Sequence, residues 1–161
     1  MGKGDQGTPA TVALTRAGIA FTTHAYDHDP RHQNYGEEAA TSLGLSTTEV
    51  FKTLLAMVDR SPVVAVVPVA GTLDLKALAS VAGGRRAEMC EPAVAQRLTG
   101  YVVGGISPIG QKRPLPTYVD ESARPLERMY VSGGRRGLDL ALSPADLIAA
   151  TAGDFARIAR A

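Results

Sequence analysis

The clearest hydrophobic pattern lies in two neighbouring apolar segments near the middle of the chain. In residues 51–58 both faces of an extended strand are apolar, with one exception at Lys52. Residues 63–67 form a second continuous apolar run after a turn at Ser61-Pro62. Such runs are typical of strands covered on both faces, so the pattern predicts a central β-hairpin. Lys52 either extends its amine to solvent at the strand end or reaches into a ligand pocket.

Helical and alternating spacing of apolar residues predicts further elements on both sides of this hairpin. Residues that cap helices well, such as Thr8 and Ser143, stand directly before prolines, and glycines such as Gly18 and Gly44 end the helical patterns. The expected helices cover residues 9–17, 35–43, 75–82, 92–98 and 144–152. The expected strands cover residues 21–26, 86–90, 117–120, 129–132 and 138–142, the last two joined as a hairpin.

These elements predict one domain. Residues 1–7 are polar and glycine-rich, and we expect them to be a disordered extension of a domain that covers residues 8–161. Helices and strands in this mixture favour an α+β fold. We expect a curled, barrel-like β-sheet that is mixed but mostly antiparallel, with helices around it.

A glycine-rich loop follows the helix expected at residues 92–98. The segment from Gly100 to Lys112 begins as a short apolar strand and then breaks at Gly104-Gly105-Ile106-Ser107-Pro108. Adjacent glycines let another group approach the main chain closely, and the proline limits the flexibility of the loop. Such a loop either directs several backbone N–H groups into one concavity, which suits an oxyanion or a phosphate, or is an ordinary turn.

Composition and charge exclude several classes of protein. With 45% hydrophobic and 20% charged residues the chain is not wholly disordered, and its net charge of only +1 gives no argument for a polyanionic partner. Residues 76–161 hold 12 Lys/Arg against 8 Asp/Glu, which permits a modest basic face for an RNA end. We expect no signal peptide and no membrane span, and a single cysteine fits a reducing, cytoplasmic compartment.

Two groups of potentially reactive side chains have simpler interpretations. His24, His28 and His32 lie near two aspartates, but no helix carries two of them at metal-ligand spacing, and Asp-Pro favours a turn over a metal site. Cys90 precedes an expected helix, which suits a nucleophile, yet Glu88 and Glu91 flank it. A small buried side chain is the favoured role for this cysteine.

Five motifs in order resemble one known family. They are Tyr26-Asp-His-Asp-Pro30, Phe51-Lys-Thr-Leu-Leu55, Pro68-Val-Ala-Gly-Thr-Leu-Asp-Leu75, Val103-Gly-Gly-Ile-Ser-Pro-Ile-Gly-Gln-Lys112 and Val131-Ser-Gly-Gly-Arg-Arg-Gly-Leu-Asp139. Together they are similar to the YbaK/prolyl-tRNA synthetase editing-domain family, over nearly everything from Thr8 onward. Within it, the chain most resembles the free-standing deacylases rather than domains inserted in a synthetase, and its length agrees with this expectation.

The resemblance implies a hydrolase that acts in trans on cysteine mischarged onto tRNA(Pro). It implies that Lys52 and the main chain of Gly104, Gly105, Ile106 and Ser107 serve catalysis, with no metal and no cofactor. The substrate-binding residues that it implies are Tyr26, Tyr35, Pro108, Arg136 and Asp139. In such enzymes the thiol of the substrate attacks its own carbonyl, so that the protein supplies position and oxyanion stabilisation. Asp139 is expected either to orient Lys52 or to accept from the substrate.

Two alternatives remain at this stage. A deacylase for another misacylated tRNA, such as alanyl-tRNA(Pro), would use water instead of the substrate thiol. A non-catalytic module would bind a tRNA end or a synthetase. For either enzyme, prolyl-tRNA synthetase is a possible partner that lends tRNA affinity.

Overall fold

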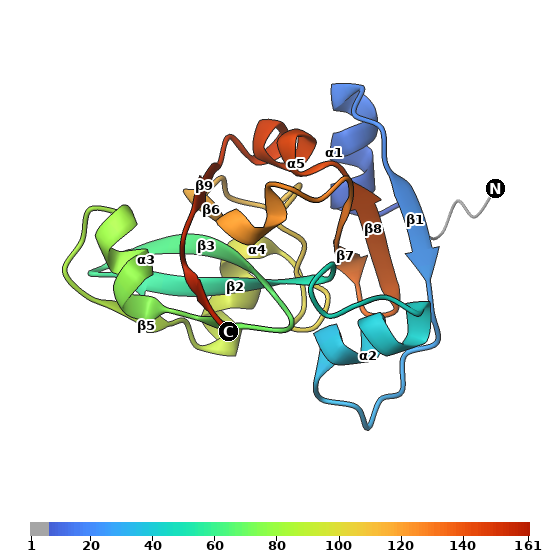
Figure 1. Ribbon diagram of the computed structural model, residues 1–161, viewed down its shortest axis with the longest axis horizontal. Coiled ribbons are helices and arrows are strands. Elements are labelled where there is room, and N and C mark those ends of the chain that lie inside the picture. Colours follow the sequence, from blue (N-terminus) through green and yellow to red (C-terminus); the bar gives the residue numbers. More distant parts are fainter. Residues whose placement is uncertain (1–6) are drawn as a thin grey trace.

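The computed structural model describes residues 7–161, so the expected extension at residues 1–7 lies, apart from Gly7, outside the described residues. Figure 1 shows two groups of elements, one around β2 and β3 and the other around β1, β7 and β8. The described helices are α1 (Pro9–Ala17), α2 (Tyr35–Leu43), α3 (Leu75–Val81), α4 (Pro92–Thr99) and α5 (Pro144–Thr151), with a short 3₁₀ helix at Glu121–Ala123.

The helix boundaries follow from local capping, as the sequence predicts. The side chain of Thr8 accepts a hydrogen bond from the Thr11 amide, and that of Ser143 accepts from the Asp146 amide. Gly18 and Gly44 end α1 and α2 with φ of 69° and 67°, a left-handed conformation that glycine adopts at little cost. The five predicted helices are thereby confirmed within one or two residues.

Within residues 7–161 the strands form three sheets and no closed barrel. Their bounds are β1 (Thr22–Ala25), β2 (Phe51–Val58), β3 (Ser61–Pro68), β4 (Thr72–Leu73), β5 (Ala87–Met89), β6 (Thr117–Asp120), β7 (Met129–Arg135), β8 (Leu138–Leu142), β9 (Asp154–Ala156) and β10 (Ala159–Arg160). The orders are β5-β2-β3-β6-β9, β1-β8-β7 and β10-β4. Pairing is parallel at β3–β6 and β6–β9 and antiparallel in the other strand pairs. The expected mixed, mostly antiparallel pairing is confirmed; the barrel-like shape is not.

The predicted hairpin is present and lies inside the five-stranded sheet. Strands β2 and β3 pair along their whole length, from Phe51 opposite Pro68 to Val58 opposite Ser61. On the other side of β2, strand β5 pairs only with Ala56–Val58, and Leu55 accepts one more bond from the Cys90 amide. Within the described residues, the N-terminal half of β2 therefore has no strand beside it in this sheet along that edge.

One predicted strand is wrong, and three short strands were not foreseen. Residues 101–103 are not a strand, because side chains take up their backbone donors: Thr99 Oγ1 accepts from the Tyr101 amide and Gln96 Oε1 from the Val103 amide. The unforeseen strands are β4, β9 and β10. Each has only two or three residues, too few for an alternating pattern.

Buried apolar residues cover both faces of the β2–β3 hairpin. Phe51, Leu55 and Val64 belong to the larger core, which also takes in α1 and the β7–β8 hairpin, while Ala56 and Val67 belong to a second core under α3. A third cluster packs α2 against Tyr130 and Ala141. Among the described residues, no helix is long and apolar enough to cross a membrane.

The C-terminal segment is held by one buried carboxylate. Oδ1 of Asp120 accepts hydrogen bonds from the amides of Ile158 at 3.0 Å and Ala159 at 2.9 Å. We expect Asp120→Ala to lower the free energy of unfolding by about 2–4 kcal/mol, because the buried amide of Ile158 and the half-buried amide of Ala159 lose their acceptor. Urea denaturation measures this. Asp154→Ala is the control, since this exposed aspartate in β9 should cost less than about 0.5 kcal/mol. Equal effects of the two substitutions would contradict the account.

Candidate active site

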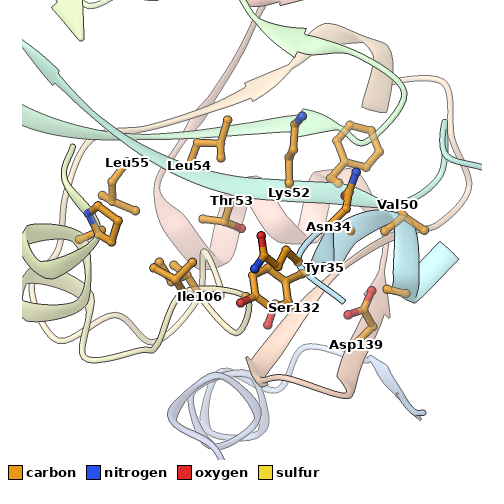
Figure 2. Close-up of a pocket in the computed structure, with 18 of the residues that line it drawn as sticks. Asn34, Tyr35, Val50, Lys52, Thr53, Leu54, Leu55, Ile106, Ser132 and Asp139 are labelled. Carbon is orange, nitrogen blue, oxygen red and sulfur yellow. The ribbon is translucent and has the colours of Figure 1, made fainter. Parts of the chain in front are cut away.

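A cavity of about 590 Å³ opens along the free edge of β2 (Figure 2). Its walls come from β2, the start of α2, the loop after α4 and the β7–β8 hairpin. At one end Leu54, Leu55 and Ile106 make it apolar; at the other end Tyr35 and Asp139 make it polar. Its volume lies in the range of about 300–1,000 Å³ that small-molecule pockets occupy.

Neighbouring residues of β2 contribute different chemistry to this cavity. Lys52 and Thr53 point to opposite sides of the strand, and both line the cavity (Figure 2). Burial lowers the pKa of Lys52, and this amine makes no hydrogen bond or ion pair with the described residues. Of the two alternatives for Lys52, the structure places it in a pocket wall.

Asp139 is a buried carboxylate that also faces the cavity. It lies in β8 opposite His24 and Ser132, and only 5% of its surface is exposed. No described residue donates a hydrogen bond to it, and burial raises its pKa to about 7. The expected orientation of Lys52 by Asp139 is not seen, because no ion pair joins the two side chains within residues 7–161.

Two tyrosines border the polar end of the cavity. Burial, followed by the negative charges of Asp139 and Glu38, raises the pKa of Tyr26 to about 12, so its hydroxyl remains protonated at neutral pH. Tyr35 is the first residue of α2, and its ring lies against Gly104: a Cβ added there would come within 2.7 Å of the ring. Any side chain at Gly104 would displace Tyr35.

Only part of the glycine-rich loop faces the cavity. Gly104 and Ile106 line it, and their amides make no hydrogen bond with the described residues. The Gly105 amide instead donates to the Val102 carbonyl at 2.8 Å and closes a turn. Gly105, Ser107 and Pro108 are buried away from the cavity wall, although the sequence groups all three with the site.

Arg136 holds the loop rather than lining the cavity. Its Nε donates to the Val103 carbonyl at 2.8 Å, and its guanidinium lies 5.0 Å from the centre of the Tyr35 ring. Charge attraction to the face of an aromatic ring adds to this contact. Arg136 is itself exposed, so it joins the loop, α2 and the β7–β8 hairpin at the surface.

The side chains of His24 and His28 are engaged with neighbours, and a buried glutamate is the residue that the sequence did not reveal. His28 Nδ1 lies 2.6 Å from Glu38 Oε1, and the Asp29 amide donates to Glu38 Oε2 at 2.8 Å. Burial raises the pKa of Glu38, but these hydrogen bonds outweigh it and lower the pKa overall. The contacts attach the loop before α2 to the helix. No three His, Cys, Asp or Glu in the described range could hold a metal.

Cys90 lies in the cavity wall but is poorly suited to nucleophilic attack. Burial and the neighbouring Glu88 raise the pKa of its thiol, which therefore stays protonated at neutral pH. The sequence had placed this side chain in the core. Thr53 and Ser132 are two further lining residues that no sequence signal singled out.

Comparison with known proteins identifies the family of this chain. Residues 30–150 match the model of the family described as "Aminoacyl-tRNA editing domain". The chain belongs to this family. The editing domain is 42% identical over 157 residues to the "Putative Cys-tRNA(Pro)/Cys-tRNA(Cys) deacylase EbsC" of Enterococcus faecalis, which covers 97% of this chain and 95% of the relative.

Two further relatives extend the comparison. The editing domain is 30% identical over 102 residues to a proline–tRNA ligase of Geobacter metallireducens, of which the match covers only 18%. The fold of this chain matches a solved structure titled "Crystal structure of a putative trans-editing enzyme for prolyl tRNA synthetase". The TM-score is 0.84 over 95% of this chain and 96% of that one, at 24% identity. That likeness concerns the fold alone.

The unpartnered carboxylate of Asp139 gives a testable pH dependence of stability. Its pKa is raised in the folded protein, so the editing domain loses stability as pH rises from about 4 to about 7, where the folded state must bury a charge. Asp139→Asn removes this loss. Between pH 4.5 and 8 we expect the free energy of unfolding of the variant to rise by up to roughly 4 kcal/mol relative to that of the wild type. The reason is that burial raises the pKa of Asp139 from 3.8 to about 7. Urea denaturation at both pH values checks this; parallel pH dependences would contradict it.

Proposed function

We propose that this protein is a trans-acting deacylase that cleaves the ester of cysteinyl-tRNA(Pro). The observation that carries the proposal is the set of unpartnered polar groups around one cavity: the Lys52 amine, the Asp139 carboxylate and the amides of Gly104 and Ile106. The aminoacylated 3′-terminal nucleotide of a tRNA carries a group for each of them, namely phosphate, ammonium and ester carbonyl. The 42% identity to a protein named as a deacylase of Cys-tRNA(Pro) and Cys-tRNA(Cys) supports the same substrate class.

The charges of the cavity suggest how the substrate is oriented. Lys52 binds the sugar-phosphate of the 3′-terminal adenosine, since a compact ammonium suits phosphate. Asp139 accepts from the α-ammonium group, which supplies the positive partner that this buried carboxylate lacks. Tyr26 and Tyr35 border the nucleoside. Arg136 and Pro108, which do not line the cavity, act by holding the loop.

In the proposed reaction the protein contributes position and donors rather than a nucleophile. The sulfur of the substrate cysteine attacks its own ester carbonyl, the bond from the carbonyl carbon to the 3′ oxygen breaks, and that oxygen takes the proton of the thiol. A thiolactone leaves and is opened by water. The amides of Gly104 and Ile106 donate to the oxyanion that forms on the carbonyl oxygen. Gly105, whose amide already closes a turn, is not part of this oxyanion site.

Two other functions make different demands on the same cavity. A deacylase for alanyl-tRNA(Pro) has to position a water, and a non-catalytic module has no use for free amides beside Gly104. Prolyl-tRNA synthetase remains our candidate partner, because ligases of that kind carry a related segment. Such a partner would supply tRNA affinity that a net charge of +1 does not. The place of action is then the cytoplasm, where tRNA is charged.

Deacylation of matched cysteinyl-, alanyl- and seryl-tRNA(Pro) by the purified protein tests the proposal. We expect rapid loss of cysteine, with alanine and serine retained, because only cysteine brings a thiol. Loss of alanine at a similar rate would transfer the reaction to water. No loss of any amino acid, with tRNA still bound, would favour the non-catalytic module.

Lys52 provides a second test. We expect Lys52→Ala to lower kcat/KM by about 10–100-fold, because a phosphate contact is lost. For the same reason, the slope of log kcat/KM against the logarithm of the salt concentration should become shallower by about 1. Lys76→Ala, which removes an exposed lysine of α3, is the matched control and should change neither value. Wild-type activity in Lys52→Ala would remove the lysine from the mechanism and leave the family assignment intact.

A further inference from the structure

One buried side-chain oxygen of a residue in the cavity wall has no hydrogen-bond partner. Oγ1 of Thr53 is shielded from solvent and makes no hydrogen bond, and within residues 7–161 it is the single buried side-chain nitrogen or oxygen of this kind. A buried hydroxyl without a partner costs about 1–3 kcal/mol. Folded proteins rarely keep such a group, so each one calls for an explanation.

The main chain of the same residue is also open on the cavity side. In an antiparallel strand the N–H and C=O of alternate residues point to the same edge. Leu55 directs its carbonyl to the Cys90 amide, so Thr53, two residues earlier, directs its own N–H and C=O to that edge. Strand β5 pairs only with Ala56–Val58 and does not reach Thr53. Thr53 therefore presents three polar groups along one stretch of cavity wall.

The position of Thr53 within the cavity suggests which part of a ligand it meets. It lies where the apolar end, formed by Leu54, Leu55 and Ile106, joins the polar end around Tyr35 (Figure 2). A group that enters the apolar end beside Thr53 meets apolar walls and one hydroxyl. Because Oγ1 is shielded, it contacts such a group only after a rotation about χ1 to another staggered position.

We propose that Thr53 determines specificity by hydrogen bonding the thiol of the aminoacyl group; this rests on the proposed function. A thiol is a weakly polar group that tolerates apolar walls and needs only one partner. With Asp139 at the polar end bound to the α-ammonium, the short side chain of the substrate extends towards Thr53. The hydroxyl thus gains its missing partner when cysteine is bound, whereas an alkyl side chain of the same shape leaves it unpaired.

Binding of uncleavable amide analogues separates this role from turnover. The probes are the 5′-monophosphates of 3′-deoxy-3′-aminoadenosine acylated with cysteine or with 2-aminobutyrate, which carries a methyl group in place of the thiol. For the wild type we expect about fivefold tighter binding of the cysteinyl amide by calorimetry, the value of one net hydrogen bond. We expect Thr53→Val to abolish this preference and Thr53→Ser to keep it.

Stability distinguishes this role from a structural one. Because Thr53→Val removes an unpaired buried hydroxyl and keeps the shape, Tm should rise by about 2–4 °C. A fall in Tm, or a cysteinyl preference that survives in Thr53→Val, overturns the inference and leaves the deacylase proposal standing. If neither amide binds the wild type, the proposed function fails and the inference fails with it.

Discussion

The early end of strand β5 is the constraint on which the site depends. Because β5 pairs only with Ala56–Val58, the preceding half of β2 keeps an open edge in the middle of a well-packed domain. An open strand edge is ordinarily a hazard, since it invites pairing with another chain. Here α2 and the loop after α4 stand beside it, and the space left between them is the cavity. Lys52 and Thr53 line the cavity because this edge is open.

Several groups around the cavity reduce the stability of the unliganded protein. Asp139 is a buried carboxylate without a donor, and Thr53 is a buried hydroxyl without a partner. Both are costs that a bound ligand can offset, and stability sacrificed at a site is common where function needs unsatisfied groups. In the proposed chemistry the ester is reactive and the substrate carries the nucleophile. The protein therefore needs hydrogen-bond donors and orientation more than it needs a catalytic side chain.

Patterns that depend on near neighbours in the chain could be predicted from the sequence. The β2–β3 hairpin and the capped helices α1 and α2 are confirmed, because apolar runs and caps act over a few residues. Residues 101–103 were wrongly predicted to be a strand, since side chains of α4 take up their backbone donors. Two features could not be predicted: which residues of Gly104–Pro108 face the cavity, and that Oγ1 of Thr53 has no hydrogen-bond partner. Both depend on where neighbouring strands end, which tertiary packing sets.

The claim that the protein positions an ester which cleaves itself is tested most directly by removing the thiol from the substrate alone. 2-Aminobutyryl-tRNA(Pro) has the shape of cysteinyl-tRNA(Pro) and carries a methyl group where the thiol would be. The account predicts that it competes with cysteinyl-tRNA(Pro) for the site and is not deacylated above the spontaneous rate. Deacylation of this substrate at a rate close to that of cysteinyl-tRNA(Pro) would contradict the account.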